Sequence, residues 1–288
     1  MWSVESSGVH LDLTGTIHGL PEGGVELPDP LVRAVDDADY LMLELDVRDL
    51  LESGGEEVIP FLLSEGYYID GGSLDDHLPS KLMKRVRVLA TDHGLPSDVL
   101  GVMRPWLAAM TLDSLVGATR GYEAERGLDM VLAEMFGSED IIALETAEYQ
   151  LGQMASLSLG DQVAFLEQVV AANEIDMVPL YIDAWNRGDP TMLEDAFGVD
   201  GTAMSGGMYK AMIVERNIRM AGILDDVLEN GEGRYLVAVG AAHFVGRLGL
   251  PEMLRRRGYR VDQLDSDGRR LLMVDETGVS QDSRSGLE

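Results

Sequence analysis

Three short, mostly apolar segments limit the fold of this 288-residue chain more than any other feature of its sequence. They cover residues 38–45, 140–146 and 234–239, and polar or glycine-rich sequence borders each of them. A segment of this length that is apolar on both faces is typical of a strand inside a parallel sheet, which helices cover on both sides. The sequence therefore predicts an α/β fold with a central, mostly parallel sheet.

The order of the patterns predicts one domain, residues 1–288, made of two parts. Strand and turn patterns at both ends indicate an α/β core over about 8–72 and 230–275. Between them, apolar residues recur at the helical period of 3.6, which indicates a large helical insert over about 73–229. At the end of the core, a βαβ unit is expected from residue 234 onward, and a last strand over 271–274.

Composition and charge exclude several classes of protein. The chain has 51 Asp and Glu against 22 Lys and Arg, a formal net charge of −29, so a phosphate backbone would be repelled and we expect no nucleic-acid partner. It has no cysteine, which excludes disulfides, thiolate metal sites and cysteine nucleophiles. No apolar run approaches about 18 residues, so no membrane span is expected.

The N-terminal residues lack the basic start and apolar centre of a signal peptide. We therefore expect a cytoplasmic protein if the chain is complete, and an exported protein if a leader has been removed. The sequence gives no prediction of the oligomeric state.

Two histidines occupy the same local pattern at opposite ends of the chain. Residues 15–18 and 240–243 both read Gly-x-x-His directly after an expected strand. The glycine allows the chain to leave the strand sharply, and the histidine then projects from the carboxyl end of the strand, where open α/β sheets bind ligands. A single pattern of this kind is more often a turn with a hydrogen-bonded histidine, and only the repetition favours a shared site for His18 and His243.

Two glutamates close expected strands in matching places. Glu44 ends the apolar segment 38–45, and Glu145 ends the segment 140–146. A carboxylate at the end of a buried strand is costly unless a metal, a cation or hydrogen bonds stabilise it. Imidazole and carboxylate groups together form a common ligand set for zinc, manganese, iron or cobalt. A solvated strand end or a helix cap is the alternative for each glutamate.

Two further residues are candidates for supporting roles. Arg216 lies on an expected helix, where it either pairs with an acid at the surface or orients a carboxylate and stabilises an oxyanion. Asp129 opens an apolar helix and is either an N-cap or a residue near the metal.

The order of these short segments along the chain resembles that seen in the TraB/GumN family, which includes the Tiki proteins. The resemblance covers about residues 10–262 and rests on segments 15–18, 43–46, 104–106, 127–129, 144–146, 185–189, 216–217 and 240–246. It implies a Tiki-, EreA- and ChaN-like fold, with an α/β core and a helical insert. It also implies a metal-dependent hydrolase, because Tiki members are described as metalloproteases that use manganese or cobalt and trim peptides.

The resemblance also implies roles for individual residues. His18, Glu44 and His243 are the implied ligands of a divalent metal, with manganese or cobalt favoured and zinc or iron as alternatives. Glu145, Arg216 and Asp129 are the implied catalytic and supporting residues. Glu145 is then expected to take the proton of a metal-bound water, and Arg216 to stabilise the oxyanion.

The expected substrate is a peptide or small protein, whose peptide bond a metal-activated water cleaves. Two alternatives remain open from the sequence. One is a protein of the same fold that binds a peptide or partner without catalysis. The other is an esterase or lactone hydrolase that uses the same site.

Overall fold

A six-stranded sheet forms the centre of the computed structural model, which describes residues 1–48, 55–56, 58–197 and 204–271. The strand order across the sheet is β4-β3-β5-β2-β1-β6. The strands are β1 (Trp2–Ser6), β2 (Val9–Thr16), β3 (Tyr40–Leu43), β4 (Ile141–Ala143), β5 (Gly233–Gly240) and β6 (Val261–Gln263).

Five of the six strands run in the same direction. β5 pairs in parallel with β2 and β3, and β3 pairs in parallel with β4. Only β1 is reversed, because it is antiparallel to both β2 and β6. The expected α/β fold with a mostly parallel sheet is therefore confirmed. β4 comes from the middle of the chain, so the sheet draws on more than the two ends.

The end of the chain departs from the expected βαβ neighbours. β6 runs in the direction of β5, but β2 and β1 lie between them in the sheet. The crossover through α14 (Leu250–Arg256) therefore passes over two strands to reach the sheet edge. The strand expected over 271–274 lies almost wholly outside the described residues.

Helices make up most of the remaining described chain. The other α-helices are α1 (Asp29–Asp37), α3 (Val58–Phe61), α4 (Ser80–Asp92), α5 (Ser97–Gly101), α6 (Pro105–Thr119), α7 (Leu128–Ala133), α8 (Ala147–Ala155), α9 (Leu159–Ala172), α10 (Val178–Arg187), α11 (Pro190–Phe197), α12 (Gly206–Tyr209) and α13 (Glu215–Asn230). Two π-helices, η1 (Leu62–Gly66) and η5 (Lys210–Val214), and the 3-10 helices η2 (Leu74–Asp76), η3 (Ala124–Arg126), η4 (Ser138–Asp140) and η6 (Ala241–Phe244) complete the set.

Two predicted helices are divided in the structure. The helix expected over 159–186 is two helices, α9 and α10, because Asp176 accepts a hydrogen bond from the backbone of Val178 and Pro179 starts the second helix. The helix expected over 208–228 contains the π-turn η5 between α12 and α13. Such π-turns are frequent at functional sites, and this one directly precedes Arg216.

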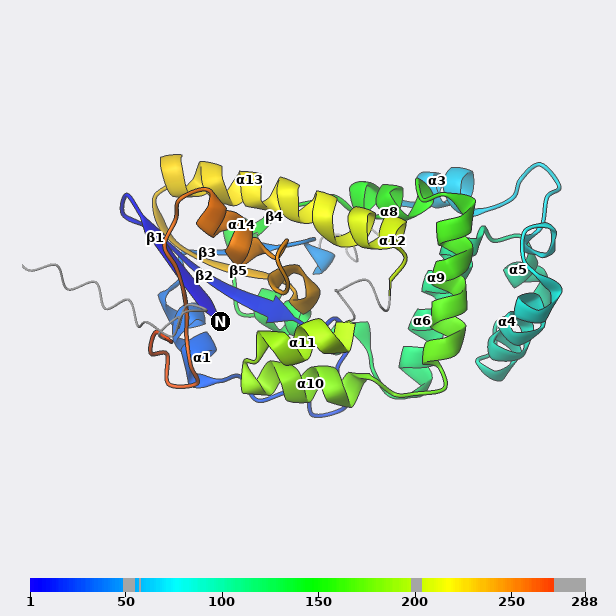
Figure 1. Ribbon diagram of the computed structural model, residues 1–288, viewed down its shortest axis with the longest axis horizontal. Coiled ribbons are helices and arrows are strands. Elements are labelled where there is room, and N and C mark those ends of the chain that lie inside the picture. The colour runs from blue at the N-terminus through cyan, green and yellow to red at the C-terminus, as the bar shows by residue number, and fades with distance from the viewer. Residues whose placement is uncertain (49–54, 57, 198–203, 272–288) are drawn as a thin grey trace, which may run out of the picture.

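Helices cover both faces of the sheet, as its apolar strands require. On one face, α13 and α14 pack on β2 and β5 around Leu11, Val237 and Leu224. On the other face, α1, α7 and α10 pack on β3 and β5 around Leu43 and Leu236. Figure 1 shows α13 and α14 above the sheet and α1 below it. The sheet with these two layers holds the strand ends rigidly in place.

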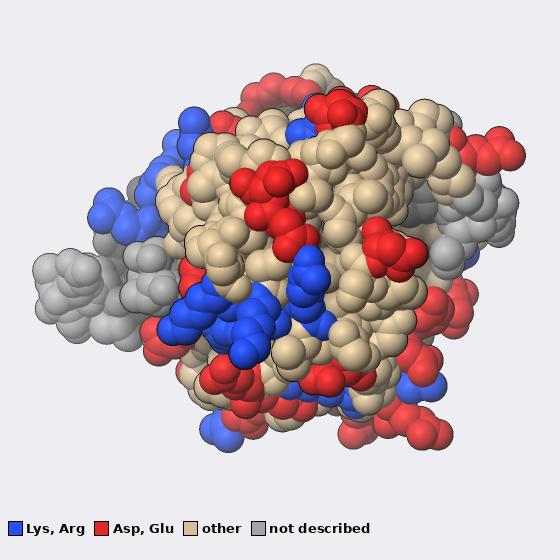
Figure 2. Space-filling model, turned by 90° about the vertical axis from the view of Figure 1, so that its right-hand side faces the viewer, with Lys and Arg blue, Asp and Glu red and all other residues tan. Residues whose placement is uncertain are grey.

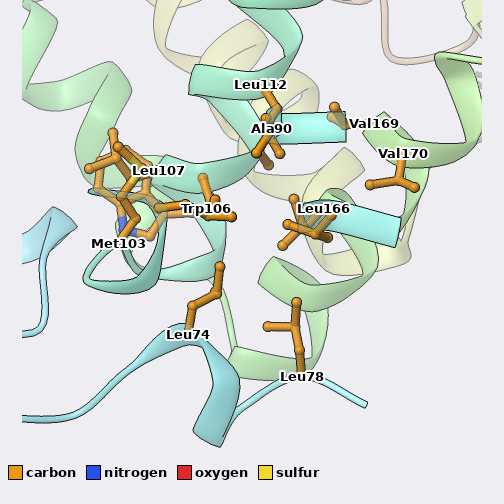
Figure 3. Packing of buried hydrophobic residues seen from close by; sticks show 14 of the residues in the cluster. Leu74, Leu78, Ala90, Met103, Trp106, Leu107, Leu112, Leu166, Val169 and Val170 are labelled. Carbon is orange, nitrogen blue, oxygen red and sulfur yellow. The ribbon is translucent and has the colours of Figure 1, made fainter. Parts of the chain in front are cut away.

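A second apolar core lies beyond the carboxyl ends of the strands. It is formed by α4, α5, α6 and α9, which we call the distal helices, and its centre contains Trp106, Leu112 and Leu166 (Figure 3). In Figure 1 these helices lie at the right, on the side toward which the β2 and β3 arrows point. The indole of Trp106 donates a hydrogen bond to the carbonyl of Glu65, which ties η1 to this core.

The surface of the distal end carries the dense basic run of α4. Figure 2 shows Lys and Arg side chains gathered on part of the face that this end of the molecule presents. The basic residues of α4 are Lys81, Lys84, Arg85 and Arg87. Arg87 pairs with Asp75 and Arg85 with Glu174, so part of this charge is neutralised locally. Among the described residues, no helix has the length and apolar character needed to cross a bilayer.

Candidate functional site

The sheet brings the two Gly-x-x-His segments together. β2 and β5 are adjacent and parallel, with Thr16 opposite Gly240 in the register. His18 therefore follows one strand and His243 follows its neighbour at the same carboxyl edge. Glu44 and Glu145 follow β3 and β4, and a backbone hydrogen bond joins Glu145 N–H to the Glu44 carbonyl. Four strand ends thus supply two imidazoles and two carboxylates to one place.

Arg216 lies between the two glutamates. Its Nε and Nη2 atoms are 2.9 and 2.8 Å from Glu145 Oε2, and Nη2 also donates a hydrogen bond to Glu44 Oε2. The three side chains are 5% exposed for Arg216, 10% for Glu44 and 0% for Glu145. The arginine is therefore not a surface residue, and it compensates two buried negative charges. These ion pairs raise the pKa of Arg216, although burial acts in the opposite direction.

Gln150 completes the link between the carboxylates. Its Nε2 donates to Glu44 Oε2 and Glu145 Oε2, at 3.1 Å in each case. Gln150 is held there by the start of α8, where the Thr146 hydroxyl caps the helix by accepting from Tyr149 N–H. Sequence reasoning did not identify this glutamine. The cap at Thr146 was the available signal, because Gln150 lies about one helical turn after this cap.

Thr146→Ala is expected to lower the free energy of unfolding by about 1 kcal/mol, because the first turn of α8 loses its cap. Thr146→Ser keeps a capping hydroxyl and should stay close to the parent protein. Urea unfolding followed by circular dichroism measures the difference. Equal loss in both variants would contradict a capping role.

His243 is buried and its orientation is fixed by Asn217. The His243 Nδ1 atom is 2.6 Å from Asn217 Oδ1, while Asn217 Nδ2 donates to the carbonyls of His243 and Leu248. Because the amide nitrogen is committed to two carbonyls, its oxygen must accept, and Nδ1 of His243 must carry the proton. Burial lowers the pKa of His243 to about 4, so the ring is neutral at pH 7. Its Nε2 atom therefore keeps a free lone pair.

The free nitrogen of His243 faces Glu44. His243 Nε2 is 3.6 Å from Glu44 Oε1, which is too long for a hydrogen bond. Glu44 Oε1 accepts instead from the backbone N–H of Gly240. Burial alone would raise the pKa of the Glu44 carboxyl, but the neighbouring imidazoles, the guanidinium and this N–H hold it well below its usual range. Glu44 is therefore a carboxylate at neutral pH.

The two glycines of the repeated pattern act by leaving space. A Cβ atom on Gly240 would be 3.0 Å from Glu44 Oε1, 3.2 Å from His18 Nε2 and 3.6 Å from His243 Cδ2. A Cβ on Gly15 would be 2.8 Å from Cα and Cβ of Ala241. Neither glycine has a positive φ, so neither position uses the left-handed region that glycine favours. The absence of a side chain at Gly240 instead lets three donor groups surround one point.

His18 approaches this point from the β2 side. Its Nδ1 atom is 3.5 Å from Asp129 Oδ1, and its ring is 63% exposed. Partial burial lowers the pKa of His18, but Asp129 and the charge of Glu44 outweigh it and raise the pKa to about 9. Asp129 is not the N-cap of α7, because Gly127 precedes that helix and no side chain caps it. The prediction that Asp129 caps this helix is therefore wrong, and its carboxylate lies near the imidazole of His18 instead.

A cavity of about 250 Å³ opens over these groups. Its lining combines His18, Glu44, Arg216 and His243 with a larger number of apolar residues. Thr16 also lines it, and its hydroxyl is buried without a hydrogen-bond partner in the described chain. Glu145 Oε1 is buried and unpartnered in the same sense. Asp129 Oδ1 is a third such atom, but neither Glu145 nor Asp129 lines the cavity, so Thr16 Oγ1 is the unpartnered oxygen of this group that a ligand in the cavity can reach.

The donors match a divalent cation in kind, and the separation of one pair is close to what a shared ion requires. Two bonds of about 2.1 Å that meet at one ion place their donor atoms roughly 3–3.5 Å apart, close to the separation of His243 Nε2 and Glu44 Oε1. Asn217 holds the far nitrogen of His243, as partners of metal-binding histidines commonly do, and Asp129 Oδ1 lies 3.5 Å from the far nitrogen of His18. Among the described residues, no three His, Asp or Glu side chains stand at coordinating distance, so His18 would have to move closer.

The similarity to known proteins extends over the part of the chain that contains the sheet and the site. A family model described as the TraB/PrgY/gumN family matches residues 1–263. The uncharacterized protein YbaP of Escherichia coli strain K12 is 25% identical over 255 residues, which span 85% of this chain and 88% of that protein. The YbaP protein of Shigella flexneri is similar to the same extent. No solved structure matches. The family match extends from β1 to the end of β6 and includes every residue of the site.

Proposed function

Because this chain belongs to the TraB/PrgY/gumN family, we propose that it is a metal-dependent hydrolase that cleaves peptide bonds, with a Tiki-, EreA- and ChaN-like fold. The observation that carries the proposal is the space above Gly240. There His18 Nε2, Glu44 Oε1 and the ring of His243 surround one point at the floor of a cavity.

His18, Glu44 and His243 are the proposed ligands of the metal, and manganese or cobalt is favoured over zinc or iron. A metal bound here would supply a water whose pKa is lowered toward about 7. The neutral state of His243 and the ionised state of Glu44 are the protonation states that metal binding requires. At His18, binding would displace the ring proton.

The remaining residues of the site divide into one proton acceptor and three positioning groups. Glu145 has a free carboxylate oxygen, Oε1, which is the atom proposed to accept a proton from water and return it to the leaving group. Arg216 donates to both glutamates and to the Met212 carbonyl, so its first role is to position the two carboxylates. Asn217 and Asp129 orient the two imidazoles.

The decisive experiment is elemental analysis combined with a peptide digest. Protein purified without chelator is analysed for bound metals, stripped, and reloaded with manganese, cobalt, zinc or iron. Each sample is then incubated with a defined peptide library, and cleavage is followed by mass spectrometry. Metal uptake near one ion per chain with cleavage restored by one metal supports the proposal.

Other outcomes separate the alternatives. Metal uptake with hydrolysis of esters or lactones but not of peptides would indicate an esterase. Peptide binding without metal uptake or cleavage would indicate a binding protein of the same fold, for which the apolar part of the cavity lining is the supporting observation.

Gly240→Ala is expected to reduce metal affinity and hydrolysis by about 10-fold or more, because the new methyl group occupies the space between the donors. The matched control is Gly222→Ala in α13, where a Cβ meets nothing within 4 Å. This control should keep its activity and gain about 0.5–1 kcal/mol in stability, because alanine favours the helix. Parent-like metal binding by Gly240→Ala would contradict the proposed position of the metal.

A further inference from the structure

The apolar part of the cavity lining, which we call the apolar wall, comes from four separate elements, α10, α11, α12 and η5. It contains Tyr181 from α10, Met208 from α12, and Met212 and Ile213 from η5, with Phe197 and Met204 beside them. Met208 is 7% exposed and Ile213 is 4% exposed. These two side chains are already shielded from water, and a ligand in the cavity would extend the apolar contacts that they make.

The charged groups of the cavity are already paired. Arg216 is held by Glu44 and Glu145, and these residues belong to the proposed reaction centre. Apart from that centre, the described residues that line the cavity include no Asp, Glu, Lys or Arg. A charged substrate side chain would therefore lose its hydration here without gaining a counter-ion, which is strongly unfavourable.

The apolar wall combines flexible side chains with a rigid aromatic pair. Methionine side chains are flexible and polarisable, so Met208 and Met212 can adjust to ligands of different shape. The rings of Tyr181 and Phe197 stack with their centroids 4.6 Å apart, which gives the wall a fixed aromatic side. Met212 is also joined to the reaction centre, because its carbonyl accepts a hydrogen bond from Arg216 Nη1.

From these contacts we infer that the cavity binds one uncharged, apolar side chain of the substrate, of the Leu, Met or Phe class, next to the bond that is cleaved. This inference rests on the proposed function, which supplies the reaction centre in the same cavity. The side chain fills the space against Met208, Met212 and Tyr181, and its backbone then lies over the donors above Gly240.

Binding of capped amino acids tests the pocket without any need for catalysis. N-acetyl amides of leucine, methionine, aspartate and lysine are titrated into the full chain by calorimetry or ligand-observed NMR. The apolar amides are expected to bind at least about 10-fold more tightly than the charged ones. Met212→Trp fills the pocket and should weaken binding of the leucine amide by a similar factor. Equal binding of all four amides, or unchanged binding by the variant, would overturn the inference.

The digest with peptides then tests the same pocket during cleavage. Sites cleaved by the metal-loaded protein should be enriched in Leu, Met or Phe at one position beside the bond. Met212→Trp should shift that preference toward Gly and Ala, whereas Met212→Ala should extend it toward Trp. Met135→Trp is the control, because Met135 is 50% exposed and lies outside the cavity.

The two experiments fail in different ways. Cleavage without enrichment, or enrichment in charged residues, overturns the apolar pocket and leaves the hydrolase proposal standing. If no peptide is cleaved with any metal, the hydrolase proposal fails, and the binding of the capped amino acids alone decides whether the pocket recognises apolar groups.

Discussion

Arg216→Met is expected to lower the free energy of unfolding by about 3–5 kcal/mol, because it leaves two buried carboxylates without their shared cation. Glu145 has no exposed side-chain area, and Glu44 is 10% exposed. Methionine keeps most of the length of the arginine side chain, so the loss measures charge compensation more than packing. Urea or guanidinium unfolding, fitted to two states, gives the change.

The control for this variant is an arginine pair at the surface. Arg187 contacts Asp183 at 2.9 Å, with side chains 62% and 48% exposed, so Arg187→Met should cost less than about 1 kcal/mol. Adding Glu145→Gln to Arg216→Met should restore part of the lost stability, because one buried negative charge disappears. A loss below about 1 kcal/mol in Arg216→Met would show that the buried carboxylates do not depend on it.

The buried glutamates were predictable from sequence for the same physical reason. An acid at the end of an apolar strand has to be compensated, so Glu44 and Glu145 indicated a cation, a metal or a hydrogen-bond network before any fold was known. The structure shows that Arg216 supplies the cation. Sequence alone did not pair Arg216 with a particular acid, because these residues lie 172 and 71 positions away from it.

The residues that orient the site were harder to predict. Asn217 and Gln150 each lie on a helix, where a polar residue usually faces water. Their roles arise only when α13 and α8 pack beside the strand ends and place the amides against His243 and the glutamates. The sequence gives one indication for each residue. Asn217 directly follows Arg216, and Gln150 lies about one turn after the cap at Thr146.

The first strand shows a local signal that was overlooked. Trp2 and Val4 alternate with polar residues, and Ser7 and Gly8 form a two-residue turn before β2. Both turn residues have positive φ, 51° for Ser7 and 90° for Gly8, which is the geometry that hairpins favour. The place of β1 between β2 and β6 was not predictable in this way, because strand order depends on contacts between distant segments.

His18→Ala and His243→Ala are each expected to abolish metal uptake and metal-dependent hydrolysis. Each variant removes one of three proposed ligands, and a pair of ligands binds an ion far more weakly than three. The variants should nevertheless differ in stability. His18 is 63% exposed, so its loss should cost little, whereas the loss of His243 leaves Asn217 Oδ1 buried without its donor, at about 1–3 kcal/mol. Elemental analysis, peptide digestion and unfolding measure these effects separately.

His77→Ala is the matched control, because His77 is exposed among the distal helices and stacks on Tyr68 instead of facing the cavity. It should retain the metal content and activity of the parent protein. The difference between the two site histidines also separates folding from ligation. If His243→Ala lost both metal and stability while His18→Ala kept its metal, the two strands would not share the metal site. Loss of metal in a fully stable His18→Ala would require an ion that both ends of the chain hold together.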